Sequence, residues 1–166
     1  MSSLEGKVAI VTGAARHRGI GRGIALALAA AGADVVALGS PRAPERYPDD
    51  EKAIGWRGAA SVAAEIEASG RRALGIDADL TNAAEADRIV AETMAKFGRI
   101  DILVNNAGLA YCGEKNLWEI DDREWYEVVD VNLNGVYLLT SRVMRKMVEA
   151  KQGGRIVNIS SAAGRI

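Results

Sequence analysis

The sequence predicts an α/β protein with a doubly wound parallel sheet, and two observations support this fold class. Short apolar runs without polar alternation recur five times in the 166 residues, which is typical of strands buried on both faces of a parallel sheet. Segments with apolar residues at helical spacing lie between these runs. Strands and helices that alternate in this way form right-handed crossovers, which cover both faces of one sheet with helices.

The expected elements follow one another along the chain. The five expected strands are residues 8–11, 35–38, 73–76, 102–104 and 156–159. Three helical stripes, which begin at Ile20, Ala59 and Ala86, each stop at a glycine, the usual residue just past a helix C-terminus. The fourth and longest stripe runs from Trp125 to Met147, and we expect one continuous helix there.

Two segments do not fit this alternation. Residues 40–56 hold all three prolines and many charges, which predicts a long surface loop, and residues 109–120 form a shorter one. No repeat or linker divides the chain, so we expect residues 1–166 to form one domain. Only seven residues follow the fifth expected strand, which would leave a sheet edge uncovered. We therefore expect the domain to be incomplete at its C-terminal side.

Composition excludes several classes of protein. The net charge is −1, which gives no electrostatic reason to expect binding to nucleic acid or to an anionic membrane. A single cysteine, Cys112, forms no internal disulfide, and with a single histidine, His17, it makes no cluster of soft metal ligands. No apolar run approaches the roughly 20 residues of a membrane span. We expect a cytoplasmic protein without a metal site.

A glycine-rich turn follows the first strand and opens the first helix. Glycines at such a turn let the backbone approach a pyrophosphate, whose charge is bound by free N–H groups at the helix N-terminus. A turn that binds no ligand is the alternative interpretation. The candidate cofactor residues of this turn are Gly13, Arg16, Arg18, Gly19, Ile20 and Gly21.

Two further motifs accompany the turn and point to a family. Asn105-Asn106-Ala107-Gly108 follows the fourth strand, and Asp79-Leu80 follows the third. With these motifs the sequence resembles the short-chain dehydrogenase/reductase family, whose glycine motif is T-G-x3-G-x-G and whose other motif is N-N-A-G. Five residues, not three, separate Gly13 from Gly19, so the loop is two residues longer than the motif. The added length leaves open which of Arg16 and Arg18 reaches the cofactor.

The resemblance implies a Rossmann fold that binds a nicotinamide dinucleotide. It assigns the adenine contact to Asp79 and Leu80, and further cofactor contacts to Asn106, Ala107 and Gly108. It also implies that a complete protein forms a homo-oligomer, a dimer or a tetramer.

Asn132 is a candidate catalytic residue. It lies on the fourth helical stripe, where we expect burial, and an unpaired buried amide would cost about 1–3 kcal/mol. A polar residue at such a position has a hydrogen-bond partner or a function. The resemblance implies that Asn132 bends this helix and holds a water molecule in a proton relay. A buried amide with a structural partner is the alternative.

Ser161 is the second candidate catalytic residue. It follows the fifth strand, and open α/β sheets bind ligands beyond the carboxyl ends of their strands. The resemblance selects Ser161 over Ser160, with its hydroxyl on the reacting carbonyl group. The family's Tyr-x-x-x-Lys pair would follow about a dozen residues later, but five residues remain. We interpret the earlier match, Tyr111 to Lys115, as a chance occurrence and expect this portion alone to be inactive.

The end of the second strand bears on the choice of dinucleotide. Enzymes of this architecture that use NAD place an acid about 20 residues after the glycine motif, and here that position is Gly39. Ser40 and Arg42 follow, so a 2′-phosphate would meet donors and no carboxylate. We expect a preference for NADP over NAD, which Glu45 in the following loop could reverse.

Three functions compete at this point. The leading one is an oxidoreductase of small-molecule alcohols or carbonyl compounds, with this chain as its cofactor-binding portion. The second is a dinucleotide-binding protein without catalysis, such as a sensor, if the chain is complete. The third is another doubly wound enzyme such as a methyltransferase, which Gly39 does not favour because that class predicts an acidic ribose contact there.

Overall fold

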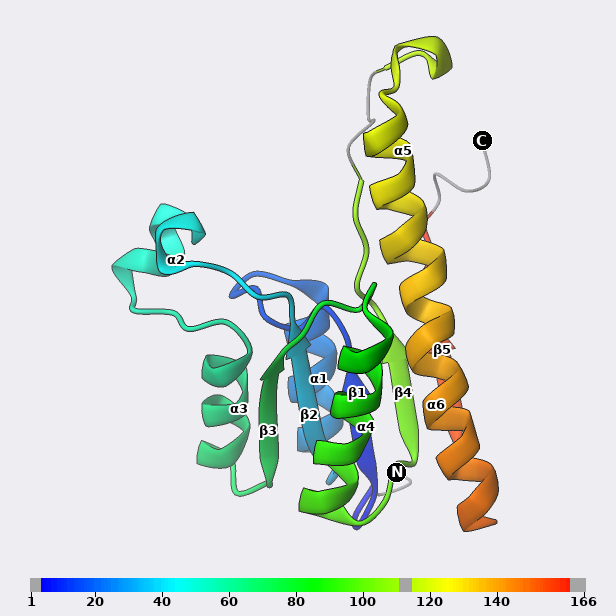
Figure 1. Ribbon diagram of the computed structural model, residues 1–166. Coiled ribbons are helices and arrows are strands. Elements are labelled where there is room, and N and C mark those ends of the chain that lie inside the picture. The colour runs from blue at the N-terminus through cyan, green and yellow to red at the C-terminus, as the bar shows by residue number, and fades with distance from the viewer. Residues whose placement is uncertain (1–3, 111–114, 162–166) are drawn as a thin grey trace.

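Five parallel strands form one sheet, in the spatial order β3-β2-β1-β4-β5 (Figure 1). The computed structural model describes residues 4–110 and 115–161. The strands are β1 (Val8–Val11), β2 (Asp34–Gly39), β3 (Ala73–Asp77), β4 (Ile102–Asn105) and β5 (Arg155–Asn158). The doubly wound fold class and the approximate place of every expected strand are therefore confirmed, although β5 begins and ends one residue earlier than expected.

Helices cover both faces of the sheet, as expected for strands without polar alternation (Figure 1). On one face, α1 (Ile20–Ala30) and α3 (Ala59–Ala68) pack against alternate residues of β2, such as Val35 and Ala37. On the other face, α4 (Ala83–Phe97) and α6 (Gly135–Ala150) pack against the residues between them, Val36 and Leu38. This alternation gives two apolar cores with the sheet between them.

The order in which the chain adds strands to the sheet reverses between β1 and β4, while all strands stay parallel. The chain passes from β1 outward to β2 and β3, then crosses back to pair β4 with β1, so that Val11 lies opposite Val104. The connections that follow β1 and β4 therefore lead to helices on opposite faces of the sheet, α1 on one and α6 on the other. In open α/β sheets a ligand crevice lies at this switch point, beyond the carboxyl ends of the strands.

The segment 40–56 is more ordered than the expected surface loop. It contains a 3-10 turn (η1, Pro44–Arg46) and a short helix, α2 (Asp49–Ala53), which Figure 1 shows beyond the upper ends of the strands. Most of its side chains are exposed, but Glu51 is only 1% exposed. The prediction of a surface loop is therefore only partly correct, and we call residues 40–56 the insert below.

The expected long helix is continuous, but it contains a π-helical turn. Its first part is α5 (Asp122–Val129), preceded by a 3-10 turn (η2, Leu117–Glu119), and a π-helical turn (η3, Asp130–Asn134) joins α5 to α6. The prediction of one buried stripe is wrong in its first half, because Trp125 and Leu133 are more than half exposed. The stripe is buried where α6 runs beside the sheet, at Leu139, Val143 and Met147.

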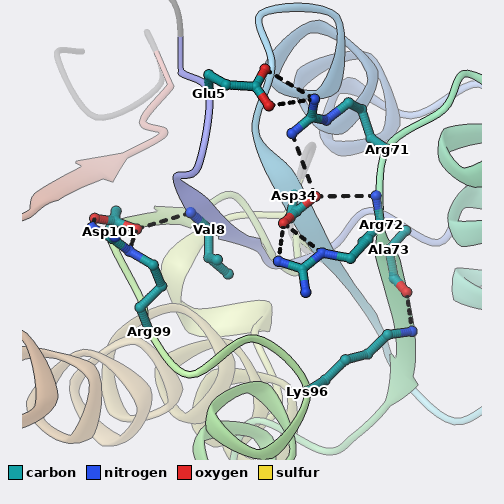
Figure 2. Close-up of polar contacts among 9 residues, drawn as sticks. All are labelled: Glu5, Val8, Asp34, Arg71, Arg72, Ala73, Lys96, Arg99 and Asp101. Carbon is teal, nitrogen blue, oxygen red and sulfur yellow. Dashed lines mark hydrogen bonds and ion pairs between the residues drawn. The ribbon is translucent and has the colours of Figure 1, made fainter.

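A polar network joins the amino ends of the strands, at the end of the sheet opposite the switch-point crevice (Figure 2). Asp34, at the start of β2, accepts hydrogen bonds from the backbone and guanidinium of Arg72. Arg71 forms ion pairs with both Glu5 and Asp34. Asp101, just before β4, accepts from Arg99 and from the N–H of Val8. These contacts hold the amino ends of the strands in register, far from the loops that carry the candidate site.

Candidate functional site

A cavity of about 350 Å³ lies at the carboxyl ends of the strands. The glycine-rich turn after β1 and the segments after β2, β3 and β4 form its walls, and it therefore occupies the expected crevice. The sequence-predicted residues that line it are Gly13, Arg16, Ser40, Arg42, Asp79, Leu80, Asn106, Ala107 and Gly108. Leu38, Gly39, Tyr47 and Ala78 also line it and were not among the expected contacts.

The glycines of the turn are required by close backbone packing. Gly13 has a φ of +66°, and a Cβ atom there would lie 2.8 Å from the Cα of Ala107. A Cβ atom on Gly21 would lie 2.6 Å from the Nδ2 atom of Asn106 and would overlap the carbonyl oxygen of Gly13. Gly19 is the N-cap residue of α1, and Ile20 is exposed at its start. Gly19, Ile20 and Gly21 therefore shape the turn without lining the cavity.

Thr12 and Asn106 join the turn after β1 to the turn after β4. The Thr12 hydroxyl oxygen accepts hydrogen bonds from the N–H groups of Asn106 and Ala107, both at 2.9 Å. The Asn106 amide donates in return to the carbonyl oxygens of Thr12 and Gly13, at 2.9 and 3.2 Å. The two motifs thus fix each other's position, and Thr12, directly before Gly13, is a positioning residue that was not among the expected site residues.

Asn105, the residue before Asn106, connects the end of β4 to α6 and β5 inside the protein. Its side chain is buried and donates to the hydroxyl of Thr140 on α6 and to the side chain of Asn158 at the end of β5. The two consecutive asparagines therefore have different roles: one connects strands inside the sheet, and the other shapes the cavity wall.

Asn132 lies in the π-helical turn and is bonded on both sides of its carboxamide. Its Oδ1 atom accepts from the N–H of Leu109, and its Nδ2 atom donates to the carbonyl oxygen of the same residue, each at 2.8 Å. The expected burial is wrong, because this part of the helix extends beyond the end of the sheet (Figure 1) and Asn132 is exposed. Leu109 and Val131 line the cavity, so Asn132 connects two parts of its wall.

The structure distinguishes the two arginines of the glycine turn. Arg16 lines the cavity, and its Nε atom lies 2.9 Å from Glu51 of the insert. The Arg18 side chain is 80% exposed, is 3.7 Å from Asp50 and does not line the cavity. Of the two, Arg16 is the residue placed to meet a ligand.

The end of β2 carries no carboxylate. A Cβ atom on Gly39 would overlap the side chain of Ala15 and lie 2.9 Å from Asp77, so a side chain is sterically disfavoured there. The guanidinium of Arg42 lies 5.7 Å from the ring centroid of Tyr47. Burial and the negative charge of Asp77 raise the pKa of Tyr47, which keeps its phenol neutral. The insert thus adds an aromatic wall beside Arg42 that spacing alone did not indicate.

The remaining candidates lie outside this cavity or outside the described residues. Ser161 is exposed beyond the end of β5. Of the match from Tyr111 to Lys115, residues 111–114 lie outside the described residues, and Lys115 pairs with Glu124 at 2.6 Å. Within residues 4–110 and 115–161, no group of three or more His, Cys, Asp or Glu side chains could hold a metal ion. No helix in the same ranges is long and apolar enough to cross a membrane.

A glycine-rich turn at a helix N-terminus, beside the switch point of a doubly wound sheet, defines the class of dinucleotide-binding α/β proteins. A family model described as short chain dehydrogenase matches residues 7–166. The chain therefore belongs to the short-chain dehydrogenase/reductase family of oxidoreductases.

Individual relatives agree with this assignment. A 3-oxoacyl-[acyl-carrier-protein] reductase of Synechocystis sp. is 42% identical over 99% of the chain and 59% of the relative. An uncharacterized NAD-dependent oxidoreductase of Mycobacterium tuberculosis is 40% identical over 98% of the chain and 57% of the relative. A crystal structure of a short-chain type dehydrogenase/reductase from Mycobacterium marinum superposes with a TM-score of 0.81 at 32% identity, covering 99% of this chain and 57% of that one. The chain thus spans somewhat more than half the length of these relatives.

Proposed function

We propose that the chain is the cofactor-binding portion of an oxidoreductase that interconverts a hydroxyl and a carbonyl group by hydride transfer, with NADP as its preferred cofactor. The observation that carries the choice of cofactor is the end of β2, where Gly39 leaves no room for a carboxylate while Ser40 and Arg42 line the cavity. The preference rests on these two donors, Ser40 and Arg42, because the nearest carboxylate is that of Asp77 on the neighbouring strand, 2.9 Å from the Cβ position of Gly39, and Asp77 does not line the cavity. The name of the mycobacterial relative argues for NAD instead, and the experiment below decides between them.

The residues around the cavity fit a dinucleotide chemically. The apolar side chains of Leu38, Ala78 and Leu80 offer walls for an adenine ring. Gly13 and Ala15 of the glycine turn bring the backbone to the cavity wall, and Arg16 and Arg42 offer cations for phosphate. When bound, the dinucleotide supplies or accepts the hydride.

The chain's own residues have two roles near the reacting group in this proposal. Asn132 fixes Leu109 and so shapes the wall that continues from Gly108. The hydroxyl of Ser161 donates a hydrogen bond to the carbonyl oxygen of the substrate. The substrate class is a small alcohol or carbonyl compound, in keeping with the reductase from Synechocystis. A binder without catalysis is not favoured, because it would need no such serine.

We further propose that the whole protein is cytoplasmic and forms a homo-oligomer. Support for assembly comes from the large apolar side chains that α5 and α6 expose, including Trp125, Tyr137 and Val148. Such exposed apolar surface is typical of a contact between proteins.

Titration of the intact protein with NADPH and with NADH tests the cofactor. We expect tighter binding of NADPH, and Arg42→Ala should weaken it about tenfold or more while leaving NADH nearly unchanged, because a charge-assisted hydrogen bond contributes about 1.5–3 kcal/mol. Arg46→Ala is a suitable control, since Arg46 is an exposed arginine of the same insert that does not line the cavity. Equal losses for both dinucleotides in Arg42→Ala would contradict the preference for NADP.

A further inference from the structure

Two unusual segments of the chain, the lengthened glycine turn and the insert, contact each other. The glycine turn is two residues longer than the motif, and the insert follows β2. The indole N–H of Trp56, at the end of the insert, donates to the carbonyl oxygen of Ala15 in the turn at 2.7 Å. The rings of Trp56 and His17 are 4.9 Å apart. The insert therefore packs on the lengthened turn.

Glu51 is the centre of this contact. It is almost completely buried, although its neighbours in the insert are exposed. One carboxylate oxygen, Oε1, accepts hydrogen bonds from the Nε atom of Arg16 and from the backbone N–H of His17, each at 2.9 Å. A buried carboxylate is costly unless it is paired, so these two donors fix the turn against the insert.

The pairing leaves part of Arg16 available to a ligand. Only its Nε atom bonds Glu51, and among the described residues no acceptor bonds its two terminal nitrogens. A guanidinium binds phosphate through two parallel N–H groups, and the terminal nitrogens offer such a pair. Arg16 also lines the cavity together with Ser40 and Arg42. Glu51 therefore orients this arginine without blocking the donors that a phosphate would use.

We propose that Glu51 is a positioning residue that directs Arg16 toward the 2′-phosphate of NADP, which makes the insert a determinant of cofactor choice. This inference rests on the proposed function. It differs from a purely structural role for Glu51 in one respect: its effect on binding must pass through Arg16 and must depend on the 2′-phosphate.

The test is a double-mutant cycle in the intact protein, with dissociation constants for NADPH and NADH and a melting temperature for each variant. Arg16→Ala and Glu51→Ala should each weaken NADPH about tenfold, and the double variant should be no weaker than Arg16→Ala alone. NADH binding should change little. Glu51→Gln keeps an oxygen that can accept both donors, so it should restore most of the NADPH affinity. Asp49→Asn is the control, because Asp49 is a fully exposed acid of the same helix.

Each other outcome identifies what fails. If the intact protein binds neither dinucleotide, the proposed function and this inference both fail. If it binds NADPH but Glu51→Ala changes nothing at an unchanged melting temperature, only the inference fails. Additive losses in the double variant, or equal losses for NADH, would also overturn it, because Glu51 would then act on the turn as a whole. If Glu51→Ala melts early, the titrations are made below its melting temperature, where a loss for NADPH without a loss for NADH still supports the inference and equal losses overturn it.

Discussion

Gly13 and Gly21 allow two loops, the glycine turn and the N-N-A-G turn, to pack closely against each other. The hydrogen of Gly21 faces the carbonyl oxygen of Gly13 and the amide of Asn106, with no space for a methyl group. Gly13 in turn approaches the backbone of Ala107. The glycine turn and the N-N-A-G turn therefore meet backbone to backbone, and the cavity wall depends on that approach.

Gly21→Ala should destabilise the protein by about 1–3 kcal/mol, the usual cost of forcing a methyl group into a packed site. Because the displaced atoms belong to the cavity wall, the same variant should also lose dinucleotide binding. Thermal unfolding and an NADPH titration measure the two effects. Gly23→Ala lies in the same helix with open space around its Cβ position, so it should be neutral or slightly stabilising. Equal behaviour of the two variants would contradict the steric argument.

Site residues that follow a strand directly could be predicted from the sequence, whereas those contributed by the insert could not. Asn106, Asp79 and Ser40 lie where the strand ends place them, because the end of a parallel strand fixes the position of the next few residues. Tyr47 and Glu51 reach the site through the fold of the insert, whose prolines and charges are typical of a solvated loop. The burial of Glu51 depends on Arg16 and His17, which are distant in sequence.

Elements were predicted well where one local pattern determines them. All five strands and the ends of α1, α3 and α4 follow from apolar runs and from glycines such as Gly98, which ends α4 in a left-handed conformation. The π-helical turn between α5 and α6 has no such apolar signal, and only the resemblance to the family marked a bend at Asn132. It coincides with the hydrogen bonds between Asn132 and Leu109, a tertiary contact that apolar periodicity does not report.

The strands are also held at their amino ends by charge, and this gives the fold a dependence on pH. Burial by itself raises the pKa of the Asp101 carboxyl, but hydrogen bonds from Arg99, from the N–H of Val8 and from Lys7 outweigh it and hold the pKa below its ordinary value. Such a carboxyl stabilises the fold fully above its unfolded pKa of about 3.9, and this stabilisation is lost as the pH falls through the lower folded value.

Asp101→Asn should therefore reduce stability near neutral pH, by about 1–3 kcal/mol for the loss of charged hydrogen bonds, and should lessen the loss of stability on acidification. Denaturant unfolding of both proteins between about pH 3 and pH 7 measures this difference. Asp49→Asn, at an exposed acid, should change stability by less than about 0.5 kcal/mol. If wild type and Asp101→Asn lose stability in parallel as the pH falls, Asp101 does not provide the dependence.

At the scale of the whole molecule, the two outer strands of the sheet, β3 and β5, differ in how well they are covered. The β3 side is covered by α3, whereas β5 is the edge strand on the other side and three of its four residues are exposed. Beside it, α6 buries Leu139, Val143 and Met147 and exposes a second apolar stripe at Tyr137, Met144 and Val148. A helix that is apolar on two stripes can bury the second one only against another surface.

The proposed homo-oligomer would use this second stripe of α6. Tyr137→Glu places a charge at a position that is 68% exposed, so the folded subunit should tolerate it, whereas burial of that charge in a contact between subunits would be costly. We expect light scattering of the intact wild-type protein to give the mass of a dimer or tetramer, and of Tyr137→Glu to give a smaller assembly. Ile54→Glu, at an exposed apolar residue of the insert, should leave the mass unchanged. A monomeric wild type, or an unchanged mass in Tyr137→Glu, would show that α6 does not form the contact.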